Sequence, residues 1–170
     1  MLRPNQHIWL CGFMGCGKST VGPLLSELCG IGFIDMDQAI EEGEGMRIPA
    51  IFSQYGEPYF RELEAAYVAK LGELPASVIA AGGGTFLSPG NAAEAKISGS
   101  IVFLDVPFET CYARIAKSDR PIVRQNTKDG LREIYEKRHS LYLRHADICF
   151  DASLSPSETA QGIALNFHII

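Results

Sequence analysis

The stretch Gly12-Phe-Met-Gly-Cys-Gly-Lys18-Ser19-Thr20 fills every fixed position of the phosphate-binding loop pattern G-x-x-x-x-G-K-[ST]. Its glycines allow the backbone to curl so that successive N–H groups point at phosphate oxygens. In this pattern Lys18 reaches the β- and γ-phosphates, and the Ser19 hydroxyl is placed to bind Mg²⁺. The stretch therefore predicts a binding site for a nucleoside triphosphate.

The residues on either side of this loop supply the structural context that the pattern needs. Residues 7–12 read as a short buried strand that enters the loop. After the loop, apolar residues recur at the i, i+3, i+4, i+7 spacing of an amphipathic helix, namely Val21, Leu24, Leu25 and Leu28. A helix N-terminus favours a bound anion, because its first-turn N–H groups and its dipole both stabilise phosphate. The residues expected to hold the nucleotide phosphates are Gly15, Cys16, Gly17, Lys18, Ser19 and Thr20.

The composition is that of one globular domain with a buried core: 170 residues, of which 46% are hydrophobic and 21% charged. The net charge of −5 argues against a nucleic-acid partner, which needs a broad Lys/Arg surface. No apolar run approaches the ~20 residues of a membrane span, and no secretory signal pattern is present, so we expect a cytoplasmic protein. The five cysteines are expected to be reduced thiols. No spare apolar helix face is evident, so we expect a monomer.

Short apolar runs alternate with longer amphipathic segments along the chain. The runs expected to form strands are residues 7–11, 32–35, 77–81, 100–106 and 148–151. Strands that alternate with helices form a parallel sheet between two helical layers, so the expected fold class is α/β. Between Lys117 and Lys128 the apolar rhythm gives way to polar residues, two arginines and a proline. This segment suits a mobile flap, although a plain surface loop remains open.

Two aspartates, Asp35 and Asp37, stand at the end of the second expected strand. Strand alternation would aim both side chains toward the crevice where open α/β sheets bind ligands. One carboxylate could hold Mg²⁺ while the other accepts a hydrogen bond from a hydroxyl about to be phosphorylated. Asp105, which ends a later apolar run, is a competing Mg²⁺ ligand. We favour Asp35, but the residue pattern alone leaves both open.

Three consecutive glycines, Gly82, Gly83 and Gly84, follow the third expected strand, which has no acidic residue at its end. Glycines at a strand edge cost conformational entropy on folding, so a compensating reason is expected. Close approach of a ligand to backbone N–H groups would be such a reason. A tight bend between strand and loop is the alternative.

Two arginines lie at unusual positions. Arg138 falls on the apolar stripe of a C-terminal helix, where an inward charge needs an anion. On a helix expected at residues 58–71, Arg61 lies one turn before Glu64, which intrudes on the apolar stripe. Snorkelling of Arg138 and an i,i+3 surface salt bridge of Arg61 are the simpler interpretations. Together with Asp37 and the glycine N–H groups, these arginines describe a pocket for a small molecule that carries a carboxylate and hydroxyls.

Several of these motifs agree in order and spacing with shikimate kinases, which the sequence resembles from about residue 8 to 151. The matching motifs are Gly12-x-x-Gly-x-Gly-Lys18-Ser19-Thr20, Asp35-x-Asp37, Phe60-Arg61-x-x-Glu64, Gly82-Gly-Gly84, Arg120-Pro121, and Arg138 with Leu141-Tyr142. The resemblance implies one P-loop kinase domain with strand order 2-3-1-4-5, a substrate-binding helical region at about 38–64 and a lid at about 118–128. It also implies transfer of the ATP γ-phosphoryl group to the 3-hydroxyl of shikimate, in aromatic amino acid biosynthesis.

The resemblance further implies roles for individual residues. It assigns Mg²⁺ to Asp35 rather than Asp105, extends Arg120 from the lid to the phosphates, and puts Arg114 near the adenine. The residues implied to bind shikimate are Asp37, Arg61, Gly82, Gly83, Gly84 and Arg138. The residues implied to border that pocket are Phe52, Phe60 and Glu64. The implied catalytic residues are Lys18, Asp37 and Arg120. The chain departs from the family in residues 152–156, which lack the basic residue often found beside the adenine.

Two rival functions remain. A gluconate kinase or a nucleoside monophosphate kinase would have a similar fold, but Asp37, Arg61 and Arg138 around three glycines suit a cyclic hydroxy acid better than a nucleotide base. A nucleotide-dependent switch protein would need an N-K-x-D signature after a strand to read guanine. Residues 126–129 carry these letters in the wrong order and inside the expected lid.

Overall fold

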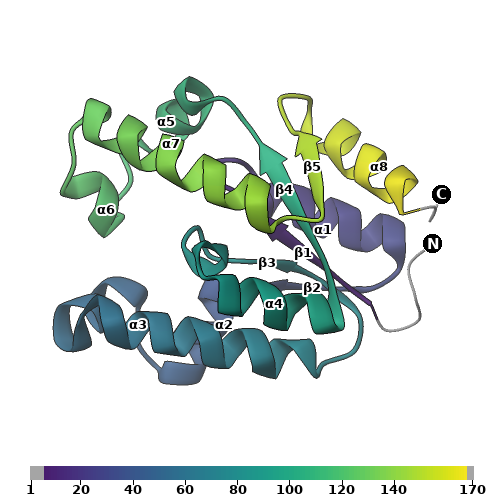
Figure 1. Ribbon diagram of the computed structural model, residues 1–170, viewed down its shortest axis with the longest axis horizontal. Helices are drawn as coiled ribbons and strands as arrows, with labels where there is room; N and C mark the ends of the chain where they lie inside the picture. The colour runs from purple at the N-terminus through teal and green to yellow at the C-terminus, as the bar shows by residue number, and fades with distance from the viewer. Residues whose placement is uncertain (1–5, 168–170) are drawn as a thin grey trace.

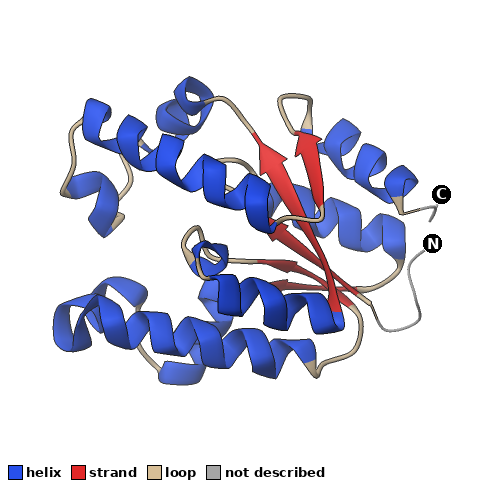
Figure 2. Ribbon diagram, viewed as in Figure 1, coloured by secondary structure: helices blue, strands red, loops and turns tan. Residues whose placement is uncertain are grey.

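The computed structural model describes residues 6–167, which contain a five-stranded parallel sheet with helices on both faces (Figures 1 and 2). The strand order, β2-β3-β1-β4-β5, is the expected one. The strands are β1 (His7–Cys11), β2 (Gly32–Asp35), β3 (Ser77–Ala80), β4 (Gly99–Asp105) and β5 (Ile148–Asp151). The expected bounds are confirmed for β1, β2 and β5, while β3 ends one residue earlier and β4 lies one residue earlier at both ends. The α/β fold class is therefore confirmed.

The helices form one layer on each face of the sheet. They are α1 (Lys18–Cys29), α2 (Met36–Glu44), α3 (Ile48–Gly72), the 3₁₀ helix η1 (Thr85–Leu87), α4 (Pro89–Ser98), α5 (Phe108–Ile115), α6 (Pro121–Arg124), α7 (Lys128–His145) and α8 (Pro156–Asn166). Figure 1 shows α1 and α8 packed together on one face, with α3, α4 and α7 on the other. Among the helices of residues 6–167, none combines the length and apolar character that a bilayer crossing requires.

The central strand β1 lies between β3 and β4, and all of its residues are buried. Helices cover both of its faces. This explains why apolar residues follow one another along His7–Cys11 and do not alternate with polar ones. From β1 the chain first builds β2 and β3 on one side and then β4 and β5 on the other. The loop after β1 therefore emerges at the point where the strand order reverses, which is where open α/β sheets bind ligands.

The helix expected at residues 58–71 is the second half of a longer helix, α3. Gly56 has a φ of 83°, a left-handed conformation that favours glycine, and it kinks α3 just before Pro58. The helix that carries Arg138 spans Lys128–His145. The polar segment between Lys117 and Lys128 contains the short helix α6. These helices all extend beyond the carboxyl edge of the sheet in Figure 1.

Candidate functional site

Two cavities of residues 6–167 open at the carboxyl edge of the sheet. The first, of about 450 Å³, is lined by the phosphate loop, Arg114 and the chain after β5. The second, of about 800 Å³, lies between α3, the glycine segment, α6 and α7. The residues that line both cavities are Met14, Ser19, Asp35, Asp37, Gly83 and Arg120. Ligands in the two cavities would therefore meet at a wall that carries a hydroxyl, two carboxylates and a guanidinium group.

The phosphate loop has the conformation that its sequence predicts. Gly15 and Gly17 adopt positive φ angles of 78° and 101°, and α1 begins directly after them at Lys18. The Lys18 ammonium group donates to the carbonyl of Gly12 at 2.7 Å, so it lies over the loop. Arg114 donates to the carbonyl of Gly15 at 2.8 Å and links α5 to the same loop. Backbone N–H groups, a helix N-terminus and two cations thus surround the first cavity.

Ser19 and Asp35 lie together at the end of the loop. The Ser19 hydroxyl donates to Oδ2 of Asp35 at 3.2 Å, and Oδ1 of Asp35 accepts from the backbone N–H of Gln38 at 3.1 Å. Hydroxyl and carboxylate oxygens are ligands that Mg²⁺ takes together with phosphate oxygens, so these residues fit that ion. Asp105, the competing candidate, instead lies 3.0 Å from Nε2 of His139 and does not line either cavity.

The structural reason given for pairing Asp35 with Asp37 is wrong. β2 ends at Asp35, whose side chain caps α2, and Asp37 lies in the first turn of that helix rather than on a strand. Strand alternation therefore does not apply to this pair. The two carboxylates nevertheless line the same cavities, because the turn into α2 begins at the sheet edge. Burial, followed by the negative charge of Asp35, raises the pKa of Asp37 to about 6.

The glycine segment leaves space for charged side chains of the site itself. A Cβ atom on Gly84 would lie 2.8 Å from Cζ of Arg61. A Cβ atom on Gly82 would lie 2.9 Å from Oδ1 of Asp37 and 3.0 Å from Oε1 of Glu64. Real Cβ atoms essentially never lie within 3.0 Å of another atom, so a side chain at Gly84 would displace the Arg61 guanidinium, and one at Gly82 would press against the two carboxylates. The entropic cost of Gly82 and Gly84 is thus compensated by the room that they leave for side chains of the protein itself.

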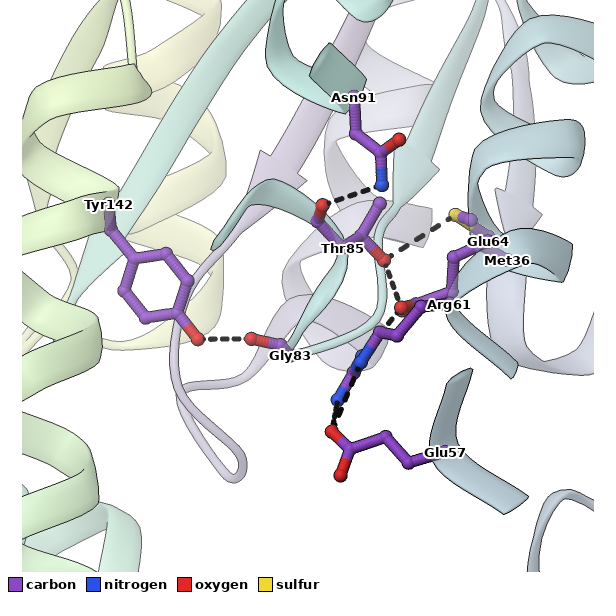
Figure 3. A network of polar contacts seen from close by, with 8 residues as sticks. All are labelled: Met36, Glu57, Arg61, Glu64, Gly83, Thr85, Asn91 and Tyr142. Atoms are coloured by element: carbon purple, nitrogen blue, oxygen red, sulfur yellow. Dashed lines mark hydrogen bonds and ion pairs between the residues drawn. The ribbon is translucent and has the colours of Figure 1, made fainter. Parts of the chain in front are cut away.

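A polar network holds Arg61 beside the glycine segment (Figure 3). Nη1 of Arg61 contacts Oε2 of Glu64 at 2.5 Å, and the Thr85 hydroxyl donates to Oε1 of Glu64 at 2.8 Å. The Thr85 carbonyl in turn accepts from the Asn91 amide at 2.9 Å. Only 1% of the Glu64 side chain is exposed, so the interpretation as a surface salt bridge is wrong for this pair. Thr85 and Asn91 were absent from the sequence prediction, because a single polar residue after a glycine segment or inside a helix carries no distinctive signal.

Helix α7 carries Arg138 into the second cavity and is anchored beside it. Arg138 is half-buried, and its Nη1 would lie 3.6 Å from a Cβ atom on Gly83. One turn later, the buried Tyr142 donates its hydroxyl hydrogen to the carbonyl of Gly83 (Figure 3). His145 lies 2.7 Å from the carbonyl of Phe86. These contacts fix the helix, and with it Arg138, against the glycine segment.

The remaining two predicted arginines also line the cavities. Arg120 is exposed, precedes α6 and lines both cavities. Arg114 lines the first cavity only. The chain after β5 also lines the first cavity, with Ala152, Leu154, Pro156 and Thr159. Small or apolar side chains after a strand carry no distinctive signal, so this wall could not be predicted from composition.

Comparisons with known proteins relate the whole chain to one family. The sequence model of the family described as "Shikimate kinase" matches residues 14–166. The chain is 42% identical to the shikimate kinase of Persephonella marina over 144 residues, which cover 84% of this chain and 87% of that one. It superposes on the Acinetobacter baumannii shikimate kinase solved in complex with shikimate with a TM-score of 0.89 and 34% identity, covering 96% and 93% of the two chains.

A more distant likeness bears on the fold alone. A gluconokinase from Sinorhizobium meliloti superposes with a TM-score of 0.56 at 17% identity, over 98% of each chain. A gluconokinase thus shares the architecture, whereas the family match and the sequence identity point to shikimate kinases. The chain therefore belongs to the shikimate kinase family, whose members transfer phosphate from ATP to shikimate.

Proposed function

We propose that this chain transfers the γ-phosphoryl group of ATP to the 3-hydroxyl of shikimate, with ATP in the first cavity and shikimate in the second. The observation that carries the proposal is the shared wall that contains Ser19, Asp35, Asp37 and Arg120. It lies between the phosphate loop and a cavity that Arg61 and Arg138 also line. A terminal phosphate and an acceptor hydroxyl would meet at this wall.

The donor side works through positioning and neutralisation of charge. Phosphoryl transfer passes through a loose transition state, so a strong base matters less than orientation and electrostatic stabilisation. The N–H groups of the phosphate loop hold the β-phosphate, and Lys18 and Arg120 stabilise the charge that spreads over the transferred group. Mg²⁺, held by Ser19 and Asp35 when bound, supplies additional positive charge to the phosphate oxygens.

The acceptor side holds a carboxylated ring. Arg61 and Arg138 both line the second cavity and bind the shikimate carboxylate, since guanidinium groups match that geometry with paired hydrogen bonds. Asp37 accepts a hydrogen bond from the 3-hydroxyl and orients it toward the terminal phosphate. With a pKa of about 6, the Asp37 carboxyl is mostly ionised at neutral pH and can take up the hydroxyl proton as the phosphate bond forms.

The test of the reaction is a coupled assay that follows ADP release with shikimate, gluconate and AMP offered separately. Turnover with shikimate, and a product whose phosphorus couples to the ring proton at carbon 3 in NMR spectra, are expected. Comparable turnover with gluconate or AMP, or none with shikimate, would refute the proposal.

The roles of the arginines are separable by kinetics. Arg138→Ala should chiefly raise KM for shikimate, because it removes a ground-state contact to the carboxylate. Arg120→Ala should chiefly lower kcat while ATP still binds. Arg144→Ala, which removes an exposed arginine of the same helix α7, is the matched control and should leave both constants unchanged. An unchanged KM in Arg138→Ala rejects the role assigned to Arg138.

We further propose that the protein acts as a cytoplasmic monomer without nucleic-acid or membrane partners. The net charge of −5 supports the absence of a nucleic-acid partner. The buried free thiols of Cys11, Cys16 and Cys111 suit a reducing compartment such as the cytoplasm. Light scattering after gel filtration should give a mass near 18.6 kDa, and a mass twice that value would contradict the monomer.

A further inference from the structure

The guanidinium group of Arg61 is occupied on two edges by two different carboxylates. Nη1 contacts the buried Glu64. On the other edge, Nε and Nη2 both donate to Oε1 of Glu57, at 3.3 and 3.0 Å (Figure 3). The Nε–Nη2 edge is one of the edges with which arginine binds a carboxylate in bidentate fashion. In the ligand-free protein, a side chain of the same helix thus fills a position that an incoming carboxylate could use.

The two carboxylates are held very differently. Glu64 is 1% exposed and also accepts from Thr85, so removing Arg61 from it would leave a buried charge without its cation. The Glu57 side chain is 64% exposed, and the described residues give it no polar partner besides Arg61. Glu57 can therefore turn into water without leaving a buried group unpaired, whereas Glu64 cannot.

The hydrogen bonds to Glu57 are also weaker than those that a well-placed carboxylate could form with the Nε–Nη2 edge of Arg61. A single oxygen, Oε1, receives both N–H groups of Arg61. A free carboxylate in the second cavity, which Arg61 and Glu57 both line, could offer one oxygen to each N–H group in two parallel bonds. Displacement of Glu57 by a ligand carboxylate is thus an exchange of one ion pair for a better aligned one.

We propose that Glu57 is an internal competitor for the substrate carboxylate, occupying the Nε–Nη2 edge of Arg61 until the ligand displaces it, and that it thereby limits the affinity for the anionic ring. This inference rests on the proposed function, in which Arg61 binds the shikimate carboxylate. It has a consequence for specificity. A ligand without a carboxylate leaves the Arg61–Glu57 pair intact, so removal of Glu57 favours the acid over its neutral analogues.

The direct test compares Glu57→Gln with wild type in steady-state kinetics. KM for shikimate should fall roughly two- to fivefold, the scale of an exposed ion pair, and the effect should lie in KM rather than kcat. The inhibition constant of the neutral methyl ester of shikimate should not change. Glu62→Gln, which removes an exposed carboxylate from the same helix, controls for net charge and should leave KM as in wild type. An unchanged or raised KM in Glu57→Gln, or an equal fall in Glu62→Gln, overturns the inference.

A double-mutant comparison separates this inference from the proposed function. Arg61→Lys keeps a cation beside Glu64 but lacks the two-donor edge, so it should raise KM and abolish the effect of adding Glu57→Gln. If Arg61→Lys and Arg61→Ala both leave KM unchanged, the role of Arg61 in the proposed function fails together with the inference. The two Arg61 variants could instead raise KM while Glu57→Gln still lowers KM in the Arg61→Lys background. The effect of Glu57 would then be a general electrostatic one, and only its competition with the substrate carboxylate would be refuted.

Discussion

At the scale of single residues, Gly84 is a position of the site where a side chain would clash with a neighbour. Its backbone has a φ of −102° and a ψ of −10°, a conformation that alanine adopts without strain. The obstacle is steric, since a Cβ atom would lie 2.8 Å from Cζ of Arg61. The glycine therefore makes room for the Arg61 guanidinium, and its own backbone conformation does not demand it.

Gly84→Ala should accordingly push the Arg61 guanidinium out of place and raise KM for shikimate, on the order of tenfold, with a smaller effect on kcat. Gly90→Ala is the matched control, because the nearest atom to a Cβ there lies 3.6 Å away, and it should leave KM unchanged. Steady-state kinetics with both variants provide the measurement. Equal KM values for Gly84→Ala and wild type would contradict the steric account.

At the scale of elements, two tyrosine hydroxyls of α7 donate to backbone carbonyls that follow two different strands. Tyr142 donates to the carbonyl of Gly83 in the glycine segment, whereas Tyr135 donates to the carbonyl of Val106 at 2.8 Å, just beyond β4. Both bonds hold the helix, but only the first touches a residue that lines the second cavity.

This difference predicts distinct outcomes for two otherwise similar substitutions. Tyr142→Phe and Tyr135→Phe should each lower the free energy of unfolding by about 0.5–1.5 kcal/mol, because each leaves a backbone carbonyl without its donor. Only Tyr142→Phe should also raise KM for shikimate, by a few fold, since Gly83 and Arg138 both lose their common anchor. Urea unfolding and kinetics on the two proteins check this. A raised KM in both variants, or in neither, would show that the anchor does not position the site.

The elements themselves were largely predictable from the sequence. Each strand, of four to seven residues, contains an apolar run bounded by polar or glycine residues, so its limits are local and were predicted to within one residue. The pairing of Asp35 with Asp37 was misread because Asp35 ends a strand and caps a helix at once. The half of α3 that precedes the kink at Gly56 also escaped prediction from the apolar pattern.

At the scale of the whole molecule, the site depends on contacts between distant parts of the chain. Sequence motifs supplied most of the charged groups, since arginines on an apolar stripe and aspartates at strand ends are visible without a structure. The hydrogen bonds of Thr85 and Asn91, and the occupation of Arg61 by Glu57, became visible only in three dimensions. Such contacts depend on how α3, α4 and the glycine segment pack, which no local pattern encodes.

The raised pKa of Asp37 links the site to the stability of the entire domain. The pKa rises from 3.8 to about 6 on folding, chiefly through burial, so the folded protein binds this proton more tightly than the unfolded chain. Asp37 therefore contributes nothing below about pH 4, destabilises progressively as the pH rises to about 6, and costs its full amount above that. The buried carboxylate of Asp37 thus lowers the stability of the folded protein at neutral pH.

Asp37→Asn should therefore stabilise the ligand-free protein at pH 7.5 by roughly 1 to 3 kcal/mol, while lowering kcat by more than about 100-fold. The gain should shrink as the pH falls from about 6 to 4, where the wild-type carboxyl becomes neutral. Urea unfolding without Mg²⁺ or nucleotide at several pH values measures this, with the exposed Glu94→Gln as control for one lost charge. A variant less stable than wild type at pH 7.5 would contradict the assigned cause.

The central claim is that the carboxylate of the acceptor fixes its hydroxyl at the wall between the two cavities. A crystal structure with ADP, Mg²⁺ and shikimate tests it most directly. We predict the carboxylate at hydrogen-bond distance, about 3 Å, from Arg61 and Arg138, and the 3-hydroxyl equally close to Asp37 and facing the β-phosphate of ADP. A ring bound with its carboxylate away from both arginines, or with the 3-hydroxyl turned from Asp37, would contradict the account.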